Sequence, residues 1–203
     1  MTETIARLHI VLADTDPLIW RRVDVPVDAS LKMLHDVIQG AMGWLDYHLW
    51  EFEADDKRYG LPDPDWDDDT LFAAKNIKLK TLLDRGVRQL LYTYDMGDNW
   101  EHVVTVEAVE TGQPATKYPR YVDGERRAPP EDVGGTPGFE AFLDAIAKPR
   151  SRDHKEAVEW HRGCYGEDFD PERINELAAK LRIGGIAKRR AAGKAAFAKT
   201  QST

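Results

Sequence analysis

The sequence predicts an α+β fold, in which an antiparallel sheet carries packed helices and leads into a C-terminal helical group. Residues 88–94 and 100–109 alternate apolar and polar side chains around a short turn, as the two strands of a β-hairpin do. Residues 31–42 instead place apolar side chains at helical spacing. The strand-like runs are joined by short connections, which favours antiparallel pairing because a parallel crossover needs a dozen residues or more.

The chain opens with a second hairpin. Residues 5–13 alternate with Ala6, Leu8, Ile10 and Leu12 on one face, which is the period of a half-buried strand. Pro17 predicts a turn, and residues 18–25 form the returning strand.

A helix and a third strand follow. Asp28 or Ser30 is expected to cap the helix, and Gly43 to end it. Residues 47–54 alternate as a strand, with a short return strand near Tyr59. Residues 62–69 form an acidic loop whose prolines argue against any regular element.

The second half is more helical. The turn of the central hairpin is Asp95–Asn99, and residues 111–135 are expected to be an irregular crossing rich in proline and glycine. Thr136 and Pro137 begin a helix, and a second runs over residues 153–160. A third begins at Asp170 and Pro171, turns Ile174, Leu177, Ala178 and Leu181 inward, and ends at Gly184–Gly185.

Length and composition favour one domain, residues 1–184, followed by a basic tail rich in Ala, Lys and Arg, residues 185–203, which is expected to be a frayed helix or disordered. The 203 residues are 42% hydrophobic and 32% charged, which is enough apolar material for a core. No apolar run approaches the ~20 residues that span a bilayer, and no secretory signal opens the chain, so we expect a cytoplasmic protein without a membrane contact. The single cysteine, Cys164, excludes an intramolecular disulfide and a cysteine zinc cage.

Charge divides the chain in the same place. Residues 1–184 hold all 36 acidic and 23 of the 28 basic residues, a net charge of −13, so this body repels nucleic acid. The tail holds the other five basic residues and no acid, which favours attraction to the body over weak contact with nucleic acid: Lys188, Arg189, Arg190, Lys194 and Lys199.

One group of polar and aromatic residues is predicted to line a cleft. Alternation turns His48 and His102 inward, and the hairpin turn and the crossing supply carboxylates that a suitable fold would bring to them. Such a cluster suits a divalent metal or general acid–base chemistry, with His48, Asp98 and His102 as the candidate metal ligands. The candidate cleft residues are His35, His48, Trp50, Tyr94, Asp95, Asp98, Trp100, His102, Glu131 and Asp132.

Each of these residues also has a structural interpretation. Aspartates at a hairpin turn usually accept hydrogen bonds from backbone amides, and a buried histidine usually bonds a carbonyl or carboxylate group. His35 is expected to lie at the edge of the core beside Gln39. Arg21 and Arg22 could clamp an anion, although ion pairs with surface acids are the expected role.

Several segments, taken in order over residues 5–182, resemble the plasmid pRiA4b ORF-3-like family. They are Pro17–Arg22, Leu34–His35 with Ile38–Gln39, Gly43–Trp44, His48–Leu49, Tyr94–His102, Pro129–Gly135 and Phe169–Glu172. The resemblance implies an α+β domain of uncharacterised function, carried as a passenger of mobile elements and sometimes labelled TnpR-like or resolvase-like. A serine recombinase needs an activated serine in an arginine-rich site, and Ser30, Ser151 and Ser202 do not form one.

The sequence thus leads to two functional hypotheses. The first is a non-catalytic binding module that recognises a protein or peptide partner in the cleft between the hairpin and the crossing, because no activated nucleophile is present. The alternative is a metal-assisted hydrolase or nuclease that uses His48, Asp95, Asp98, His102 and Glu131.

Overall fold

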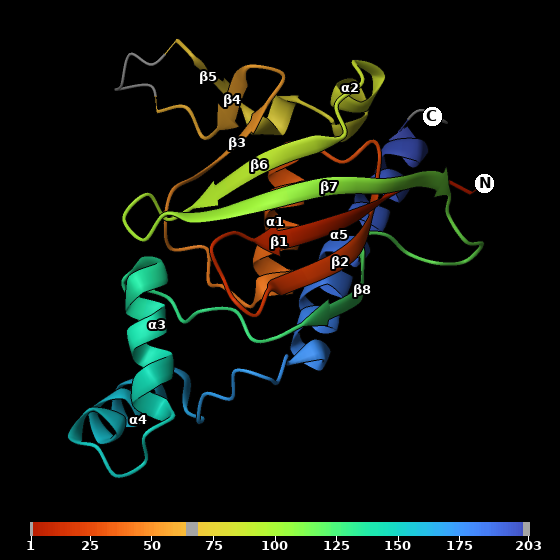
Figure 1. Cartoon of the computed structure of the whole chain (residues 1–203). Helices are drawn as coiled ribbons and strands as arrows, with labels where there is room; N and C mark the ends of the chain where they lie inside the picture. Colours follow the sequence, from red (N-terminus) through yellow and green to blue (C-terminus); the bar gives the residue numbers. More distant parts are fainter. Residues whose placement is uncertain (1, 64–68, 201–203) are drawn as a thin grey trace.

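The computed structural model describes residues 2–63 and 69–200, and its centre is one eight-stranded sheet (Figure 1). The strand order is β5-β4-β3-β6-β7-β1-β2-β8, and every described pair is antiparallel except the parallel pair β4 and β5. The strands are β1 (Thr4–Leu12), β2 (Ile19–Pro26), β3 (Trp50–Ala54), β4 (Lys57–Gly60), β5 (Leu71–Ala73), β6 (Gln89–Tyr94), β7 (Trp100–Thr111) and β8 (Arg120–Glu125). The predicted α+β class is confirmed.

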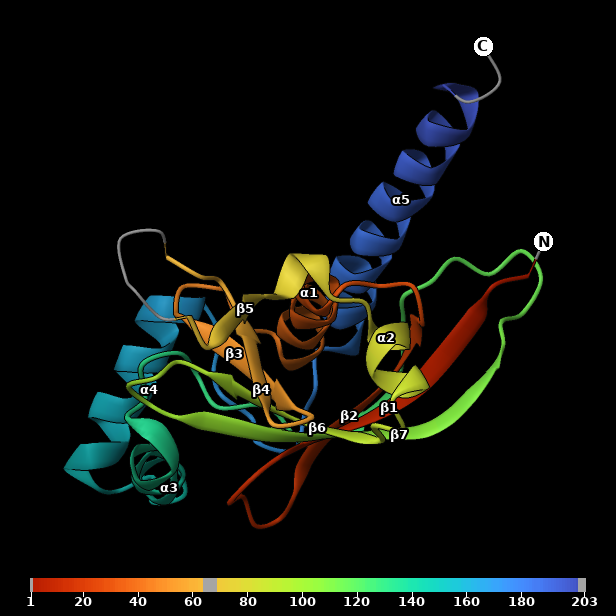
Figure 2. The ribbon, with the colours of Figure 1, turned by 90° about the horizontal axis from the view of Figure 1, so that it is seen from above.

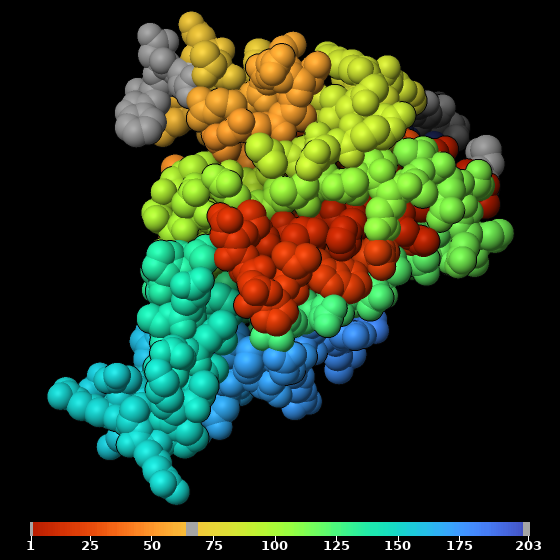
Figure 3. Space-filling model, in the orientation of Figure 1, coloured from red at the N-terminus to blue at the C-terminus, as the bar shows by residue number. Residues whose placement is uncertain are grey.

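Four of the helices form two pairs. Helices α1 and α5 lie together against one face of the sheet, whereas α3 and α4 pair at one end of it (Figures 1 and 2). On the opposite face, β1, β2 and β7 lie open toward the viewer, and none of the described helices covers them (Figure 3). The helices are α1 (Leu31–Met42), the 3₁₀ turn η1 (Ala74–Asn76), α2 (Leu79–Asp84), α3 (Gly135–Ile146), α4 (Arg152–Tyr165) and α5 (Glu176–Thr200). No helix among the described residues is both long and apolar enough to cross a membrane.

The core lies between the sheet and α1. Alternate residues of β1 are buried, and β1 pairs with β2 on one side and with β7 on the other. Helix α1 buries its apolar stripe against the strands, including Leu34 and Ile38. The predicted caps of α1 are confirmed: the Ser30 hydroxyl accepts from the Met33 amide at 3.2 Å, and Gly43 ends the helix in the left-handed region at φ 96°.

Two predicted boundaries in the sheet are wrong. The third strand begins at Trp50 and not at residue 47, so His48 lies in the loop before it. The predicted irregular crossing contains a strand, β8, which pairs with β2 at the edge of the sheet. Residues 64–68 of the predicted acidic loop lie outside the described residues.

Helix α5 differs most from its prediction. It begins at Glu176, continues through Gly184–Gly185, and buries Ala179, Ile183, Ile186 and Ala187. Leu177 and Leu181, predicted to face inward, are exposed. The face of α5 that carries Ile183 is turned inward because it packs closely against α1 at Gly40. A Cβ atom on that glycine would lie 3.2 Å from the Ile183 side chain. The division into residues 1–184 and 185–203 stays a prediction.

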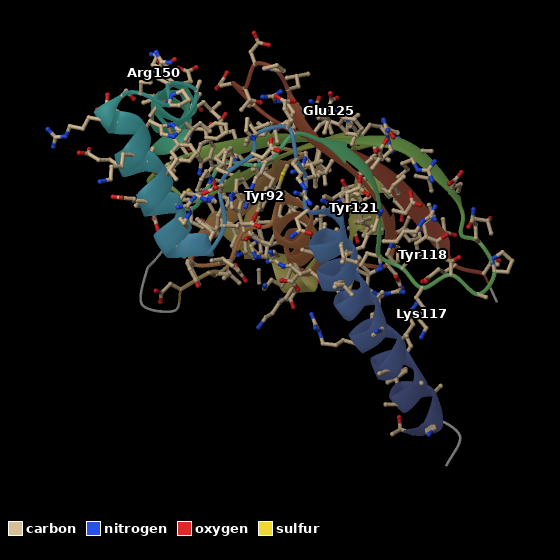
Figure 4. All side chains as sticks on the ribbon, turned by 90° about the horizontal axis from the view of Figure 1, so that it is seen from below. Tyr92, Lys117, Tyr118, Tyr121, Glu125 and Arg150 are labelled. Carbon is tan, nitrogen blue, oxygen red and sulfur yellow. The ribbon has the colours of Figure 1, made fainter. Side chains whose placement is uncertain are left out.

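Two basic residues in the second half of α5 pair with acids of the body, which is the attraction that the charge distribution favoured. Arg190 pairs with Glu3 at 2.6 Å and also with Asp28, and Lys194 lies 3.2 Å from a carboxylate oxygen of each acid. The far end of α5 projects beyond the sheet (Figure 2). Tyr121 of β8 lies beside an early turn of the same helix, with Lys180 Nζ 5.7 Å from its ring centre (Figure 4).

Candidate functional site

A histidine and three carboxylates from three separate segments meet at one end of the sheet. His48 precedes β3, Asp95 opens the turn between β6 and β7, and Glu131 and Asp132 lie between β8 and α3. His48 Nε2 lies 3.2 Å from Asp132 Oδ1, 3.5 Å from Asp95 Oδ2 and 3.9 Å from Glu131 Oε2. We call these four residues the His48 cluster.

The hairpin turn orients Asp95. Its backbone is left-handed, at φ 59°, and its Oδ1 accepts from the amides of Gly97 at 2.9 Å and Asp98 at 3.3 Å. The expectation that an aspartate at this turn accepts hydrogen bonds from backbone amides therefore holds for Oδ1 of Asp95. The other oxygen, Oδ2, is the one nearest to His48.

A second contact holds the turn against the segment that carries Glu131 and Asp132. Asp98 Oδ2 accepts from the Gly134 amide at 3.1 Å. At Gly135, whose φ is 65°, an added Cβ would lie 2.7 Å from the Asp98 carbonyl oxygen. Only a residue without a side chain allows the two backbones to approach this closely.

Buried donors hold Glu131 in place. Its Oε1 accepts from the Leu45 amide at 2.6 Å and from the Tyr94 hydroxyl at 3.1 Å, and its own amide donates to the Tyr165 hydroxyl at 2.8 Å. Burial raises the pKa of Glu131, against the lowering effect of the Leu45 and Tyr94 hydrogen bonds. Burial also raises the pKa of Tyr94, which remains a neutral donor.

The His48 cluster has the dimensions of a divalent-metal site. Nε2 of His48 is buried, yet none of the described residues gives it an aligned hydrogen bond. One ligand atom from each of His48, Asp95 and Asp132 lies within 4.8 Å of the other two. Ligands held about 2.0–2.6 Å from one ion lie about 3–4 Å apart, so this donor set fits a cation that accepts nitrogen and oxygen.

A second histidine–carboxylate group, built from His35, Asp36 and Asp46, is different. His35 Nε2 donates to Asp46 at 2.8 Å, which makes Nδ1 the acceptor from the Tyr92 hydroxyl, also at 2.8 Å. The His35 ring stacks on Trp50 with centroids 3.9 Å apart. Burial, with a smaller effect of Lys32, lowers the pKa of His35 to about 3. The predicted position at the edge of the core is wrong, because the ring is fully buried.

The remaining candidate residues support the fold and do not belong to the His48 cluster. His102 is fully buried and donates from Nδ1 to the Tyr92 carbonyl at 3.1 Å, and burial lowers its pKa to about 4. Among the described residues, the two groups with metal-ligand spacing include neither His102 nor Asp98. The expected ligand set of His48, Asp98 and His102 is therefore not brought together, and Asp95 and Asp132 lie beside His48 instead. Trp50 and Trp100 are core residues.

Sequence reasoning missed two residues that shape the site. Trp44 stacks on Tyr94 with centroids 5.0 Å apart and donates to the Pro129 carbonyl at 2.9 Å. Tyr165, the last residue of α4, holds the Glu131 amide across 34 positions of sequence. Trp44 could have been found from the Gly43–Trp44 pair, which is one of the segments that resemble the family. No local sequence pattern indicates Tyr165.

The fold and the cluster define a class: an α+β domain with a mainly antiparallel sheet and a histidine–carboxylate group at one end. The profile of the plasmid pRiA4b ORF-3-like protein family matches residues 4–178, and the chain belongs to this family. It is similar to the uncharacterized protein y4hQ of Sinorhizobium fredii (strain NBRC 101917 / NGR234), with 37% identity over 189 residues that cover 89% of this chain and 95% of the relative.

A solved structure shares the fold. The crystal structure of MM3350 from Methanosarcina mazei Go1, described as a protein of unknown function, superposes with a TM-score of 0.78 at 33% identity. The match covers 87% of this chain and 98% of that one. Neither relative is described as a resolvase, and the resolvase-like label that came with the resemblance is not supported.

Proposed function

We propose that the domain is a cation-dependent binding module, in which the His48 cluster holds a divalent metal and the surrounding surface receives a peptide partner. The observation on which this proposal rests is that three carboxylates lie within 3.9 Å of His48 Nε2, a buried nitrogen that forms no hydrogen bond with the described residues. Without a cation, three acids around one imidazole repel each other, and a divalent ion removes that repulsion.

Exposed apolar side chains around the cluster support a peptide partner. Tyr47 and Leu49 flank His48 in sequence and are 71% and 64% exposed, and Met96 follows Asp95 and is also exposed. Large apolar side chains gathered beside a polar site are typical of interaction surfaces. A peptide with an acidic group next to an apolar side chain suits this surface, because its carboxylate would complete the coordination of the cation.

Metal binding is tested with the Asp95→Asn and His48→Ala variants. Asparagine keeps the oxygen that caps the turn and tolerates the left-handed backbone, but it removes the charge. We expect Mn²⁺ or Zn²⁺ at about 100 times its Kd to stabilise the wild type by about 2.7 kcal/mol, and to stabilise neither variant.

The matched control for metal binding is His9→Ala, which removes a histidine from the uncovered face of the sheet, where it contacts Trp20. This variant should keep the full stabilisation. Absence of any change in Tm with Mn²⁺, Zn²⁺, Mg²⁺ or Ca²⁺ would refute the cation site.

Partner recognition is tested by selecting peptides from a random library on the metal-loaded protein. We expect selected peptides to contain an acidic residue, to be released by a chelator, and to bind Tyr47→Ser and Leu49→Ser at least several-fold more weakly. Phe72→Ser, which removes an exposed apolar side chain from β5, is the control. Selection of no peptide, or binding unaffected by the two rim variants, would contradict the peptide proposal while leaving the metal result intact.

A metal-assisted hydrolase is the second candidate, and one feature favours it. The Asp132 side chain is 70% exposed, so a cation held there would keep positions open to water, as catalytic metal sites do. The test is metal-dependent hydrolysis of bis(p-nitrophenyl) phosphate and of p-nitrophenyl acetate. Hydrolysis that Asp95→Asn abolishes would establish this candidate, and no turnover with the metal-loaded protein would exclude it for these ester classes.

A further inference from the structure

Arg21 is a buried cation that forms no ion pair with a carboxylate of the described residues. It lies in β2, points to the helix-covered face with Ile19 and Val23, and is 1% exposed. Arg22, the next residue, points the other way and pairs with Glu107 at 2.7 Å, the expected role of both arginines. That role is wrong for Arg21, because no carboxylate of residues 2–63 or 69–200 lies within 4 Å of its guanidinium.

Among the described residues, backbone carbonyls alone accept hydrogen bonds from the Arg21 guanidinium. Its Nε donates to Ala41 at 2.9 Å, and its Nη1 donates to Trp20 at 2.7 Å and to Glu125 at 2.9 Å. Nη2 has no hydrogen-bond partner among the described residues. Burial lowers the pKa of Arg21 to about 10, so the group remains charged at neutral pH. A buried charge held only by neutral acceptors is costly unless a counter-ion joins it.

Arg21 lines a cavity of about 200 Å³ between the end of α1, the segment before Glu131, and the first turns of α5. Two more arginines line it. Arg127 is paired with Glu167, the only acid among the lining residues of the described chain, at 2.6 Å. Arg182, at an exposed position of α5, donates to the Trp44 carbonyl and has no carboxylate within 4 Å among the described residues. Glu131 and Asp46 act on its charge only from a greater distance. The cavity is therefore lined by two guanidinium groups that form no direct ion pair with a described carboxylate, in a protein of net charge −8.

The helix ends do not decide the sign of the cavity. Helix α1 ends there and presents carbonyl groups, one of which Arg21 already occupies, whereas α5 begins there and presents amides. These opposite partial charges offset each other. The guanidinium groups of Arg21 and Arg182 thus set the potential.

We propose that this cavity binds a small organic carboxylate, with its anionic head between Arg21 and Arg182. Arginine donors match carboxylate oxygens in charge and in planar geometry. The walls favour an organic acid over inorganic phosphate, because Trp44, Pro129 and Phe169 offer apolar surface to a carbon body. The volume limits the ligand to a small molecule.

The test compares benzoate with benzamide, which have nearly the same shape but differ in charge. Binding is followed by NMR on the indole N–H of Trp44, in protein freed of metals by chelation and dialysis so that the His48 cluster does not contribute. We expect benzoate or succinate to shift this signal, benzamide to bind at least about 10-fold more weakly, and phosphate to bind more weakly than either carboxylate.

Variants locate the site. Arg182→Met changes an exposed residue and should fold, and we expect it to weaken carboxylate binding roughly 10- to 100-fold, the range for a hydrogen bond to a charged group. Arg21→Met should abolish binding, but it also removes the donor that Arg21 supplies to three buried carbonyls, so the conclusion depends on Arg182→Met. Arg189→Met on the same helix and Arg22→Met on the same strand are the controls and should bind as the wild type does.

Several outcomes would overturn the proposal. They are equal binding of benzoate and benzamide, stronger binding of phosphate than of any carboxylate, or binding that Arg182→Met leaves unchanged. No shift of the Trp44 signal with benzoate, phenylacetate or succinate at concentrations well above millimolar would overturn it too. Failure of metal binding at His48 would not affect this result, because the experiment uses metal-free protein.

Discussion

The two histidine–carboxylate groups contain the same kinds of side chain but differ in how far the protein satisfies them. Around His35, both ring nitrogens have hydrogen bonds, and Lys32 lies 2.6 Å from Asp36 and 3.8 Å from Asp46. Around His48, no cationic side chain of the described residues lies within 4 Å of Asp95, and Nε2 has no aligned partner. Composition alone does not distinguish a structural network from a ligand site, whereas the supply of internal donors does.

The largest expected effect comes from removing the satisfied histidine. His35→Ala deletes a fully buried ring that stacks on Trp50 and bonds Tyr92 and Asp46. We expect it to lower the free energy of unfolding by about 3 kcal/mol, because it creates a cavity and leaves buried polar groups unpaired. His48→Ala should lower it by less than about 1 kcal/mol in metal-free protein. Equal losses in urea denaturation would remove the distinction between the two groups.

A smaller effect is expected from Gly135→Ala, which disturbs the His48 cluster without changing any of its side chains. The added Cβ would lie 2.7 Å from the Asp98 carbonyl and would separate the hairpin turn from Asp132. We expect a loss of about 2 kcal/mol together with weaker metal binding. Gly86→Ala is the control, since φ is 89° there and nothing lies within 4 Å of the new atom. It should cost about 1 kcal/mol and leave metal binding unchanged.

The pH dependence of stability tests the charge state of His35. Its pKa is about 3 in the folded protein and about 6.5 when unfolded, so between these values the unfolded chain binds one more proton. Stability therefore falls as the pH falls from about 6.5 towards 3, by about 1.4 kcal/mol per pH unit for this residue. His102, with a pKa of about 4, acts in the same direction. His35→Gln should reduce the measured slope near pH 5 by about 1.4 kcal/mol per unit, and an unchanged slope would mean that His35 is not neutral.

The smallest effect is expected from Lys32→Met. Lys32 is partly exposed, and its ion pair with Asp36 spans one turn of α1, so its loss should cost less than about 1 kcal/mol. Both ring nitrogens of His35 stay bonded in this variant, so we expect no cation binding to appear. Calorimetric titration with Zn²⁺ checks this. New tight binding would show that Lys32 alone separates the two groups.

Elements that local patterns determine were predictable from the sequence. The hairpin of β6 and β7 and the caps of α1 follow from alternation, a glycine-containing turn and residues with strong positional preferences. Strand β8 was not predictable because it lies among prolines and glycines and exists through its pairing with β2. Helix α5 passes through Gly184–Gly185 because Ile183 and Ile186 pack against the body, which outweighs about 1 kcal/mol per glycine.

The candidate site was predictable only in its residue types. Period-two alternation placed His48 and His102 alike, but the strand starts after His48, so only His102 entered the core. The choice between Asp95 and Asp98 depends on the turn: Asp98 bonds the Gly134 amide, whereas Asp95 turns one oxygen to His48. Arg21 could not be distinguished from Arg22, because its environment is built from the end of α1 and residues 127–130.

The position of β1 between β2 and β7 has a consequence for the growing chain on the ribosome. Its partner β2 is synthesised directly after it, but its other partner, β7, begins only at Trp100. Until then one long edge of a hydrophobic nascent hairpin has unpaired amides and carbonyls, which is the kind of surface that recruits other strands. Translation rate and holdase chaperones should therefore affect the yield of this protein in cells.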